Sequence, residues 1–403
     1  MSDAPNVKSG PLAGLRVLEL GTLLAGPFCG QLLGDFGAEV IKIEPPGQGD
    51  PMRVWGREKA NGKSLWWPVV ARNKKAITLD LRQAEGQQLL RELVAKADFL
   101  LENFRPGTME KWGLGWTELS AINPRLIMIR VSGFGQTGPY SRQAGFGAIG
   151  EAMGGLRYVV GDPTTPPSRM GISIGDSLAA TFACVGALSA LHHRERTGRG
   201  QVVDSAIYEA VLNMMESLVT EYDKANFIRE RTGAILPNVA PSNVYKTRDG
   251  MVLIAANQDT VFSRLAEAMG QPELSSDPRY SSHGARGAHQ AELDARVEAW
   301  TSTLSTREVL DLMDSHGVPA GLIYRPPDML DDPHFQAREA IVSVPHPDFG
   351  ELRMQNVAPK LSETPGSIRS PSPAMGQHND EVYQGLLGLD DARYAALKAA
   401  KVV

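Results

Sequence analysis

Residues 15–43, LRVLELGTLLAGPFCGQLLGDFGAEVIKI, decide the fold of this chain. The apolar run Leu15–Leu20 predicts a buried strand, Pro27–Phe36 predicts a helix, and Glu39–Ile43 predicts a second strand. Two strands joined through a helix form a βαβ unit, in which both strands lie parallel in one sheet. The stretch therefore predicts an α/β fold.

The same alternation continues along the next hundred residues. Further strands are predicted at Ala76–Leu81, Phe99–Glu102 and Leu126–Val131, and helices at Ala84–Ala97 and Trp116–Ile122. Alternating strands and helices are typical of a mostly parallel sheet covered by helices. We therefore expect a Rossmann-like large domain.

The pattern changes in the second half of the chain. A long apolar helix is predicted after Asp176, and another at Ala206–Phe227. A hairpin then follows around the turn Thr247–Gly250, with helices near Val261, Ala291 and Arg307, strands near Leu322 and Ile341, and a last helix at Asp391–Ala399. A chain of 403 residues exceeds the size of an ordinary single core. We expect a large domain in residues 1–227, a smaller α+β domain in 228–318, and a return to the large domain in 319–403.

Composition excludes several classes of function. The net charge of −5 gives no overall basic field for nucleic acid or an anionic membrane. The apolar run at Leu178–Leu191 is too short to span a bilayer, and the first residues lack the apolar core of a signal peptide. Cys29 and Cys184 have neither a CxxC partner nor a histidine cluster for zinc. These features predict a cytoplasmic protein without a metal.

Three loops are candidates for binding an anionic ligand. The turn Gly21–Pro27 leads from a strand into a helix, but it lacks the glycine spacing of a dinucleotide fingerprint and a Walker GK[ST] motif, which argues against an NAD enzyme. The cationic segments Arg72–Lys75 and Glu102–Gly107 lie at ends of predicted strands. Residue types alone leave open whether these loops bind phosphate or are merely solvated.

Asp176 has two interpretations at the start of its apolar helix. An aspartate at this place is a preferred N-cap, since its carboxylate accepts hydrogen bonds from the free amides of the first turn. The same place suits a nucleophile, because the positive end of the helix dipole favours the ionised carboxylate and nearby glycines leave room for a substrate. The residues alone do not decide between the two.

Motifs along nearly the whole chain resemble those of family III CoA-transferases. They lie, in the same order as in the family, at residues 11–20, 34–44, 49–50, 72–75, 102–107, 133–139, 197–201 and 376–378. The resemblance implies a large domain built from both chain ends, a smaller domain from the middle, and two subunits interlaced like links of a chain. It also implies that Asp176 is the catalytic residue.

The resemblance further implies a set of contacts to coenzyme A, which would be substrate and product rather than a tightly bound cofactor. The implied residues are Leu23, Leu24, Asn73, Lys74, Lys75, Ala76, Asn103, Phe104, Arg105, Lys111, Ala144, Gly145, Phe146 and Gly147. Two departures argue against a formyl or oxalyl substrate. Pro45 stands where formyl-CoA transferase has a basic residue, and that enzyme's run of glycines in the small domain is missing.

The implied chemistry is a double displacement at a carboxylate. Asp176 would attack an acyl-CoA thioester to give a mixed anhydride, and CoA would pass to a free carboxylic acid. An aspartate is ionised at neutral pH and a thiolate leaves readily, so neither a metal nor a strong base is required. Backbone amides of glycine-bearing loops are natural donors to the oxyanion.

Substrate and reaction type leave alternatives open. Arg53 and Arg169 are candidates to hold the distal carboxylate of a dicarboxylate such as succinate, or equally to form structural salt bridges. An acyl-CoA racemase of the same fold would need a histidine where Phe146 stands, so half of its acid/base pair is missing. A non-catalytic acyl-CoA-binding protein is the remaining alternative.

Overall fold

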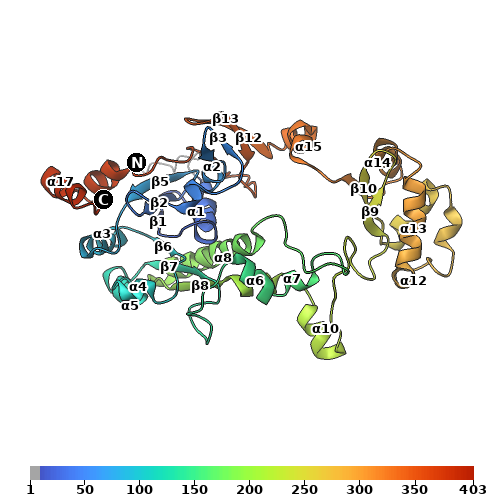
Figure 1. Cartoon of the computed structure of the whole chain (residues 1–403), viewed down its shortest axis with the longest axis horizontal. Helices are drawn as coiled ribbons and strands as arrows, with labels where there is room; N and C mark the ends of the chain where they lie inside the picture. The colour runs from blue at the N-terminus through green and yellow to red at the C-terminus, as the bar shows by residue number, and fades with distance from the viewer. Residues whose placement is uncertain (1–9) are drawn as a thin grey trace. The chain divides into compact units, whose positions relative to one another are not determined.

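The computed structural model describes residues 10–403 and contains a six-stranded parallel sheet (Figure 1). Its strand order is β5-β2-β1-β6-β7-β8. The strands are β1 (Arg16–Glu19), β2 (Glu39–Glu44), β5 (Lys74–Thr78), β6 (Phe99–Glu102), β7 (Ile127–Ser132) and β8 (Val202–Ala206). The predicted α/β fold with a mostly parallel sheet is confirmed. Strand order reverses between β1 and β6, and such a switch point is where open α/β sheets bind ligands.

The chain forms two compact units. Of the described residues, the first contains 10–156, 170–220 and 336–403, and the second contains 157–169 and 221–335. These bounds differ from the predicted domains 1–227, 228–318 and 319–403. The predicted division into domains stays a prediction.

The remaining elements of the first unit surround the sheet. They are α1 (Ala25–Asp35), η2 (Pro51–Arg53), β3 (Lys59–Ala60), β4 (Lys63–Ser64), α2 (Trp67–Val70), α3 (Ala84–Val94), α4 (Thr108–Lys111), α5 (Trp116–Ile122), α6 (Gly147–Met153), α8 (Ile174–Thr197), α9 (Ile207–Asn213), β12 (Ile341–His346), β13 (Gly350–Gln355), η4 (Glu381–Leu386) and α17 (Asp391–Ala399). Three helices cross the bounds of the units: α7 (Leu156–Val159), α10 (Leu218–Ala225) and α16 (Pro333–Ala337).

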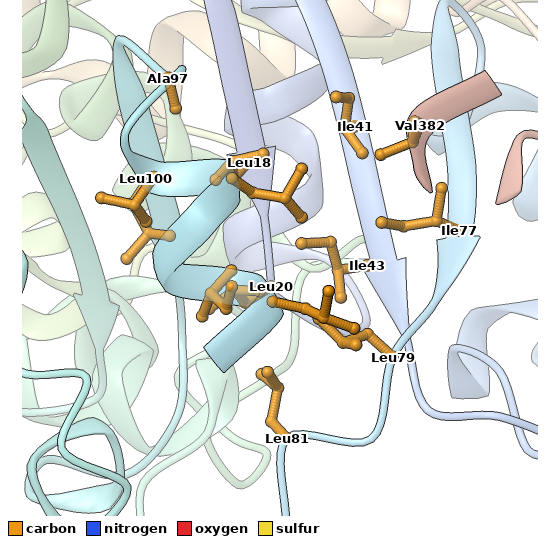
Figure 2. Packing of buried hydrophobic residues seen from close by; sticks show 14 of the residues in the cluster. Leu18, Leu20, Ile41, Ile43, Ile77, Leu79, Leu81, Ala97, Leu100 and Val382 are labelled. Carbon is orange, nitrogen blue, oxygen red and sulfur yellow. The ribbon is translucent and has the colours of Figure 1, made fainter. Parts of the chain in front are cut away.

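Side chains on the two faces of the sheet enter two separate cores, because successive residues of a strand point to opposite faces. In β1, Leu18 faces one core and Val17 the other. The first core takes residues of α3, α5 and α17, and Figure 2 shows Val382 of the C-terminal part beside Ile41 and Ile77. The second core takes residues of α1, α8 and α9. The sheet is therefore the middle of three layers, and both ends of the described chain contribute to it.

The outer edge of β5 is covered by a segment from the C-terminal part. The ring Nδ1 of His378 accepts from the amide of Ala76 at 3.1 Å, and the amide of His378 donates to the carbonyl of Ala76 at 2.9 Å. Oδ1 of Asn379 accepts from the amide of Thr78 at 2.9 Å. An open strand edge carries unpaired backbone groups that promote aggregation. Residues 378–379 satisfy those groups in β5.

The second unit has an antiparallel sheet of order β11-β10-β9 (Figure 1). The predicted hairpin is confirmed, since the amide of Thr247 donates to the carbonyl of Gly250 at 3.0 Å. The elements are β9 (Ser242–Lys246), β10 (Met251–Ala255), α11 (Asp259–Ala268), η3 (Pro272–Ser275), α12 (His283–Ala288), α13 (Gln290–Thr301), α14 (Thr306–Ser315), β11 (Ala320–Leu322) and α15 (Pro326–Asp331). The strand predicted near Leu322 pairs with β10, so it belongs to this unit.

One predicted helix is wrong, and a strand just before it was missed. The helix predicted at Ala206–Phe227 is divided into α9 and α10, and Glu216 between them adopts a left-handed φ of 50°. A helix cannot continue through that conformation. Strand β8 was not predicted, because its sequence VVDSA mixes polar and apolar residues and is short. Its pairing with β7 extends the sheet at the edge opposite β5.

Candidate active site

Asp176 is the third residue of α8. The interpretation of Asp176 as an N-cap is wrong: the helix begins at Ile174, its N-cap is Ser173, and Gly175 packs against α6. The Asp176 side chain is half-buried. A carboxylate in the first turn still gains from the positive end of the helix dipole. The correction therefore removes the capping role and keeps the electrostatic one.

The Asp176 carboxylate lies directly against Gly147, the first residue of α6. A Cβ atom placed on Gly147 would be 2.7 Å from Oδ2 and 2.8 Å from Oδ1 of Asp176. At those separations, any side chain at position 147 would displace the Asp176 carboxylate. The structure therefore brings together two positions that lie 29 residues apart in the sequence (176 − 147) and that were expected, respectively, to be catalytic and to contact CoA.

The loop between β7 and α6 carries Ala144, Gly145, Phe146 and Gly147 to this place. Its two ends cross at close range, since a Cβ atom on Gly133 would lie 2.9 Å from the Cα atom of Gly145. Phe146 is 68% exposed. A glycine crossing and an exposed aromatic ring next to Asp176 form an open-sided site with accessible backbone.

Residues at the switch point are joined by the side chain of Asn103. Its Oδ1 accepts from the amide of Thr22 at 2.8 Å, and its Nδ2 donates to the carbonyl of Thr22 at 2.9 Å. Leu23, with a left-handed φ of 64°, donates its amide to Oδ1 of Asp50 at 3.1 Å. The turn carrying Leu23 and Leu24 after β1 and the loop after β6 are thus held side by side at the carboxyl edge of the sheet.

A pocket of about 230 Å³ opens next to this switch point. It is lined by Leu20, Thr22, Ile43, Glu44, Pro45, Gln48, Leu79, Asp80, Leu81, Arg82, Phe104 and Trp112. Its walls come from the ends of β1, β2, β5 and β6 or the residues that follow them. Apolar walls with a few polar groups suit the planar base of a nucleotide. Of the pocket's polar residues, Gln48, Asp80 and Arg82 were not expected from the sequence.

Lys74 is a structural cation rather than part of a solvated loop. Its ammonium is buried, contacts both carboxylate oxygens of Glu19 at 2.8 and 3.0 Å, and donates to the carbonyl of Pro27 at 2.7 Å. Burial lowers the pKa of Lys74, and Glu19 offsets this in part. The ammonium of Lys74 is thus already paired within the fold, and the contact of Lys74 with CoA stays a prediction.

Asn73 and Lys75 also form contacts within the chain. Nδ2 of Asn73 donates to Asp35 at 2.7 Å and to the carbonyl of Ser367 at 2.8 Å, and its side chain is buried. Lys75 is half-exposed and pairs with Glu39 and Glu381 at 2.5 and 2.6 Å. The side chain of Asn73 therefore fastens the C-terminal part to the first unit, whereas Lys75 remains accessible at the sheet edge.

Arg105 and Lys111 are the cations that suit phosphate binding. Both are exposed, and within residues 10–403 neither forms a salt bridge. The loop beneath them is fixed by Glu102, whose carboxylate accepts from the amide of Phe104 at 2.7 Å and from Arg130 at 2.7 Å. Burial raises the pKa of Glu102, and Arg130 opposes that effect.

The guanidinium of Arg53 is engaged on both of its edges. It forms a bidentate pair with the buried Glu44, with both distances at 2.7 Å, and donates to the carbonyl of Pro373 at 3.1 Å. It also lies over the ring of Trp67, 3.8 Å from the centroid. Arg169 is exposed and belongs to the second compact unit, whereas Asp176 belongs to the first.

One residue of this site was missed by the sequence analysis. Glu151 of α6 is 0% exposed and accepts the amide hydrogen of Gly175 at 3.3 Å. A glutamate in an amphipathic segment gives no signal of burial. Among residues 10–403, no group of three or more His, Cys, Asp and Glu side chains is arranged to hold a metal ion.

Comparison with known proteins agrees with this geometry. The model of CoA-transferase family III matches residues 12–379. The succinyl-CoA–D-citramalate CoA-transferase of Chloroflexus aurantiacus is 63% identical over 98% of each chain. The beta subunit of succinyl-CoA–L-malate CoA-transferase from the same organism is 45% identical over 98% of each chain.

A solved structure extends the likeness to three dimensions. The crystal structure of a CAIB/BAIF family protein from Brucella suis superposes with a TM-score of 0.83 at 34% identity, covering 94% of this chain and 100% of that one. The family match spans both units, the switch-point residues and Asp176. The resemblance noted in the sequence is confirmed: this chain is a CoA-transferase and belongs to CoA-transferase family III.

Proposed function

We propose that this enzyme moves CoA from succinyl-CoA to a dicarboxylate, with D-citramalate as its acceptor and Asp176 as its covalent nucleophile. The observation that carries the substrate is 63% identity, over 98% of both chains, to a succinyl-CoA–D-citramalate CoA-transferase. The observation that supports the nucleophile is the place of Asp176 in the first turn of α8, where its carboxylate lies directly against Gly147.

The proposed reaction has four displacements that restore the enzyme. The Asp176 carboxylate attacks the succinyl carbonyl, which expels CoA thiolate and leaves a mixed anhydride. The thiolate then attacks the aspartyl carbonyl, which releases succinate and forms an aspartyl-CoA thioester. The acceptor carboxylate displaces CoA thiolate from this thioester to form a second anhydride. The thiolate finally attacks the acceptor's acyl carbon and frees Asp176.

We assign the CoA contacts to two groups of residues. Leu23, Leu24, Asn103 and Phe104 border the switch point and its pocket, and suit the nucleotide part of CoA. Arg105 and Lys111 are exposed cations for its phosphates, whereas the predicted contact Lys75 is half-exposed and paired with Glu39 and Glu381. The remaining contact is the loop Ala144–Gly147, which brings the backbone of α6 to the reacting carboxylate and suits the thioester end.

A panel of acceptors tests the proposed substrate. The purified enzyme is incubated with succinyl-CoA and, separately, D-citramalate, L-malate, glutarate, mesaconate or oxalate, and the new CoA esters are measured by mass. We expect D-citramalyl-CoA to form with the highest kcat/KM. A higher kcat/KM for any other acid in the panel would contradict the assignment of D-citramalate.

Arg53 and Arg169 stay the two residues predicted to hold the distal carboxylate, and the guanidinium of Arg53 is paired with Glu44. Arg169→Lys should raise KM for D-citramalate about 10-fold and leave KM for a monocarboxylate such as acetate unchanged, because a lysine cannot form the bidentate pair. Arg53→Lys should mainly lower the melting temperature. Equal KM changes for both acids in Arg169→Lys would exclude this role.

Racemase activity should be undetectable. Phe146 cannot transfer a proton, and its loop neighbours Ala144, Gly145 and Gly147 have no side chain that could. The measurement is the incorporation of deuterium at the α-carbon of 2-methylacyl-CoA in D₂O. Incorporation above that of the buffer alone would show that another acid/base pair acts at the site.

We also propose that two copies interlace into a dimer in the cytoplasm. Helix α8 buries one face through Ala179, Ala183 and Ala187, and exposes Val185 and Leu188 on another, by 56% and 41%. Large apolar side chains grouped on one helix face of a folded chain suit a protein interface. The thiols of Cys29 and Cys184 are free, in keeping with a reducing compartment.

Charges on the exposed face of α8 should separate the copies. The double variant Val185→Asp, Leu188→Asp is expected to be a monomer in size-exclusion chromatography with light scattering, because two carboxylates cannot be buried unpaired in an interface. The control is Ile122→Asp, which changes an equally exposed apolar residue at the end of α5. An unchanged mass for the α8 variant would place the interface elsewhere.

A further inference from the structure

Glu151 is a buried acidic residue that the reaction above does not use. It lies in the middle of α6 and is 0% exposed. A buried carboxylate costs free energy unless hydrogen-bonding partners compensate for its lost water. Glu151 lies one helical turn after Gly147 in α6. Because Gly147 contacts Asp176, Glu151 lies close to the active site.

The contacts of Glu151 reach the residue immediately before Asp176. Its Oε1 accepts the amide hydrogen of Gly175 at 3.3 Å. A Cβ atom on Gly175 would lie 2.9 Å from Cγ of Glu151 and 3.1 Å from the carbonyl oxygen of Gly147. Helix α6 therefore holds Gly175 between a side chain and a backbone group, and no larger residue fits there.

The amide of Gly175 needs a partner from outside its own helix. It belongs to the first turn of α8, whose amides have no carbonyl within the helix to bind. Within the described residues, the N-cap Ser173 supplies no capping hydrogen bond from its side chain. A carboxylate is the favoured group at the positive end of a helix. Glu151 thus caps α8 from a different helix.

We propose that Glu151 is a positioning residue for the reaction. Its hydrogen bond to Gly175 fixes the first turn of α8 and thereby orients the Asp176 carboxylate beside Gly147. The inference rests on the proposed role of Asp176 as nucleophile. Gly175 is bonded directly to Asp176, so a shift of the backbone at Gly175 also shifts the Asp176 carboxylate. A displacement of about 1 Å at a reacting atom can cost about 100-fold in rate.

Three substitutions separate positioning from charge and from folding. Glu151→Leu removes the acceptor, Glu151→Asp keeps the charge but shortens the reach, and Glu151→Gln keeps an acceptor oxygen at the same reach without the charge. The control is Glu209→Gln, which removes an exposed carboxylate from neighbouring α9. For each protein, the single-turnover rate of acyl-enzyme formation from succinyl-CoA, the KM for succinyl-CoA and the melting temperature are measured.

We expect Glu151→Leu and Glu151→Asp to form acyl-enzyme about 10- to 100-fold more slowly, with KM within about 3-fold of wild type. Glu151→Gln and Glu209→Gln should stay within about 3-fold of the wild-type rate, because the amide oxygen still accepts from Gly175. A wild-type rate of acyl-enzyme formation in Glu151→Asp would overturn the proposal. This outcome can be read even if Glu151→Leu does not fold. A rate for Glu151→Gln as low as that of Glu151→Asp would overturn it too, since the charge and not the contact would then matter.

The same experiment distinguishes failure of this inference from failure of the proposed nucleophile. The acyl-enzyme is trapped with hydroxylamine and located by peptide mapping. Trapping at Asp176 in the wild type, together with unchanged rates in the Glu151 variants, would overturn positioning and keep the nucleophile. Trapping at another residue would overturn both.

Discussion

Asp176→Asn will abolish CoA transfer while the protein stays folded. The amide oxygen is a poor nucleophile and cannot form the anhydride, so we expect kcat to fall by at least on the order of 10⁴-fold with KM for succinyl-CoA nearly unchanged. Folding should be unaffected, because the N-cap of α8 is Ser173 and Asn is nearly isosteric with Asp. The measurement is steady-state kinetics beside thermal unfolding, with Asp176→Ala as a second variant.

A chemical label accompanies this result. Incubation of the wild type with succinyl-CoA and then hydroxylamine or borohydride should mark the peptide that contains Asp176, because both reagents react with activated aspartyl carbonyls. The Asn variant should remain unmarked. Near wild-type turnover by the Asn variant, after mass spectrometry has excluded deamidation to Asp, would refute Asp176 as the nucleophile.

Gly147→Ala should also slow the reaction strongly, although less than a change of Asp176 itself. The added methyl carbon would lie 2.7 to 2.8 Å from the atoms of the Asp176 carboxylate, inside van der Waals contact. The carboxylate must rotate away, and we expect kcat to fall by about 100-fold or more. Alanine is otherwise favourable in a helix, so the melting temperature should fall little.

Gly284→Ala is the matched control for that substitution. Gly284 is likewise in the first turn of a short helix, α12, but a Cβ atom there would meet nothing within 4 Å. We expect wild-type kinetics for this variant. If Gly147→Ala also retained wild-type kcat, the carboxylate would have to react from a direction that does not involve α6.

The parts of the fold that the sequence predicts are those with a local signal. Strands such as Phe99–Glu102 are continuous apolar runs, and buried parallel strands have that composition. The hairpin around Thr247–Gly250 has both its turn and its flanking strands within a few residues. The catalytic role of Asp176 was inferred from the family resemblance, because the residues around Asp176 fit a helix N-cap equally well.

Three failures at the site share one cause, which is a partner distant in sequence. Lys74 has the sequence context of a surface loop, and its burial depends on Glu19 in a strand 55 residues away. Glu151 is polar in an otherwise ordinary helix, and its burial depends on Gly175. The N-cap of α8 is Ser173 rather than Asp176 for the same reason, since Gly175 packs against α6. Pairings of this kind become visible once the elements are packed.

The cover on the edge of β5 sets the order in which the enzyme can be completed during synthesis. His378, which binds Ala76, follows it by 302 residues. At about 5–20 residues per second, a ribosome needs about 15–60 s to make that stretch. The second compact unit lies wholly within that stretch, so it can fold before residues 378–379 are available to cover β5. The nascent sheet thus carries an open strand edge for most of translation, and this interval is when a chaperone would have the greatest effect on yield.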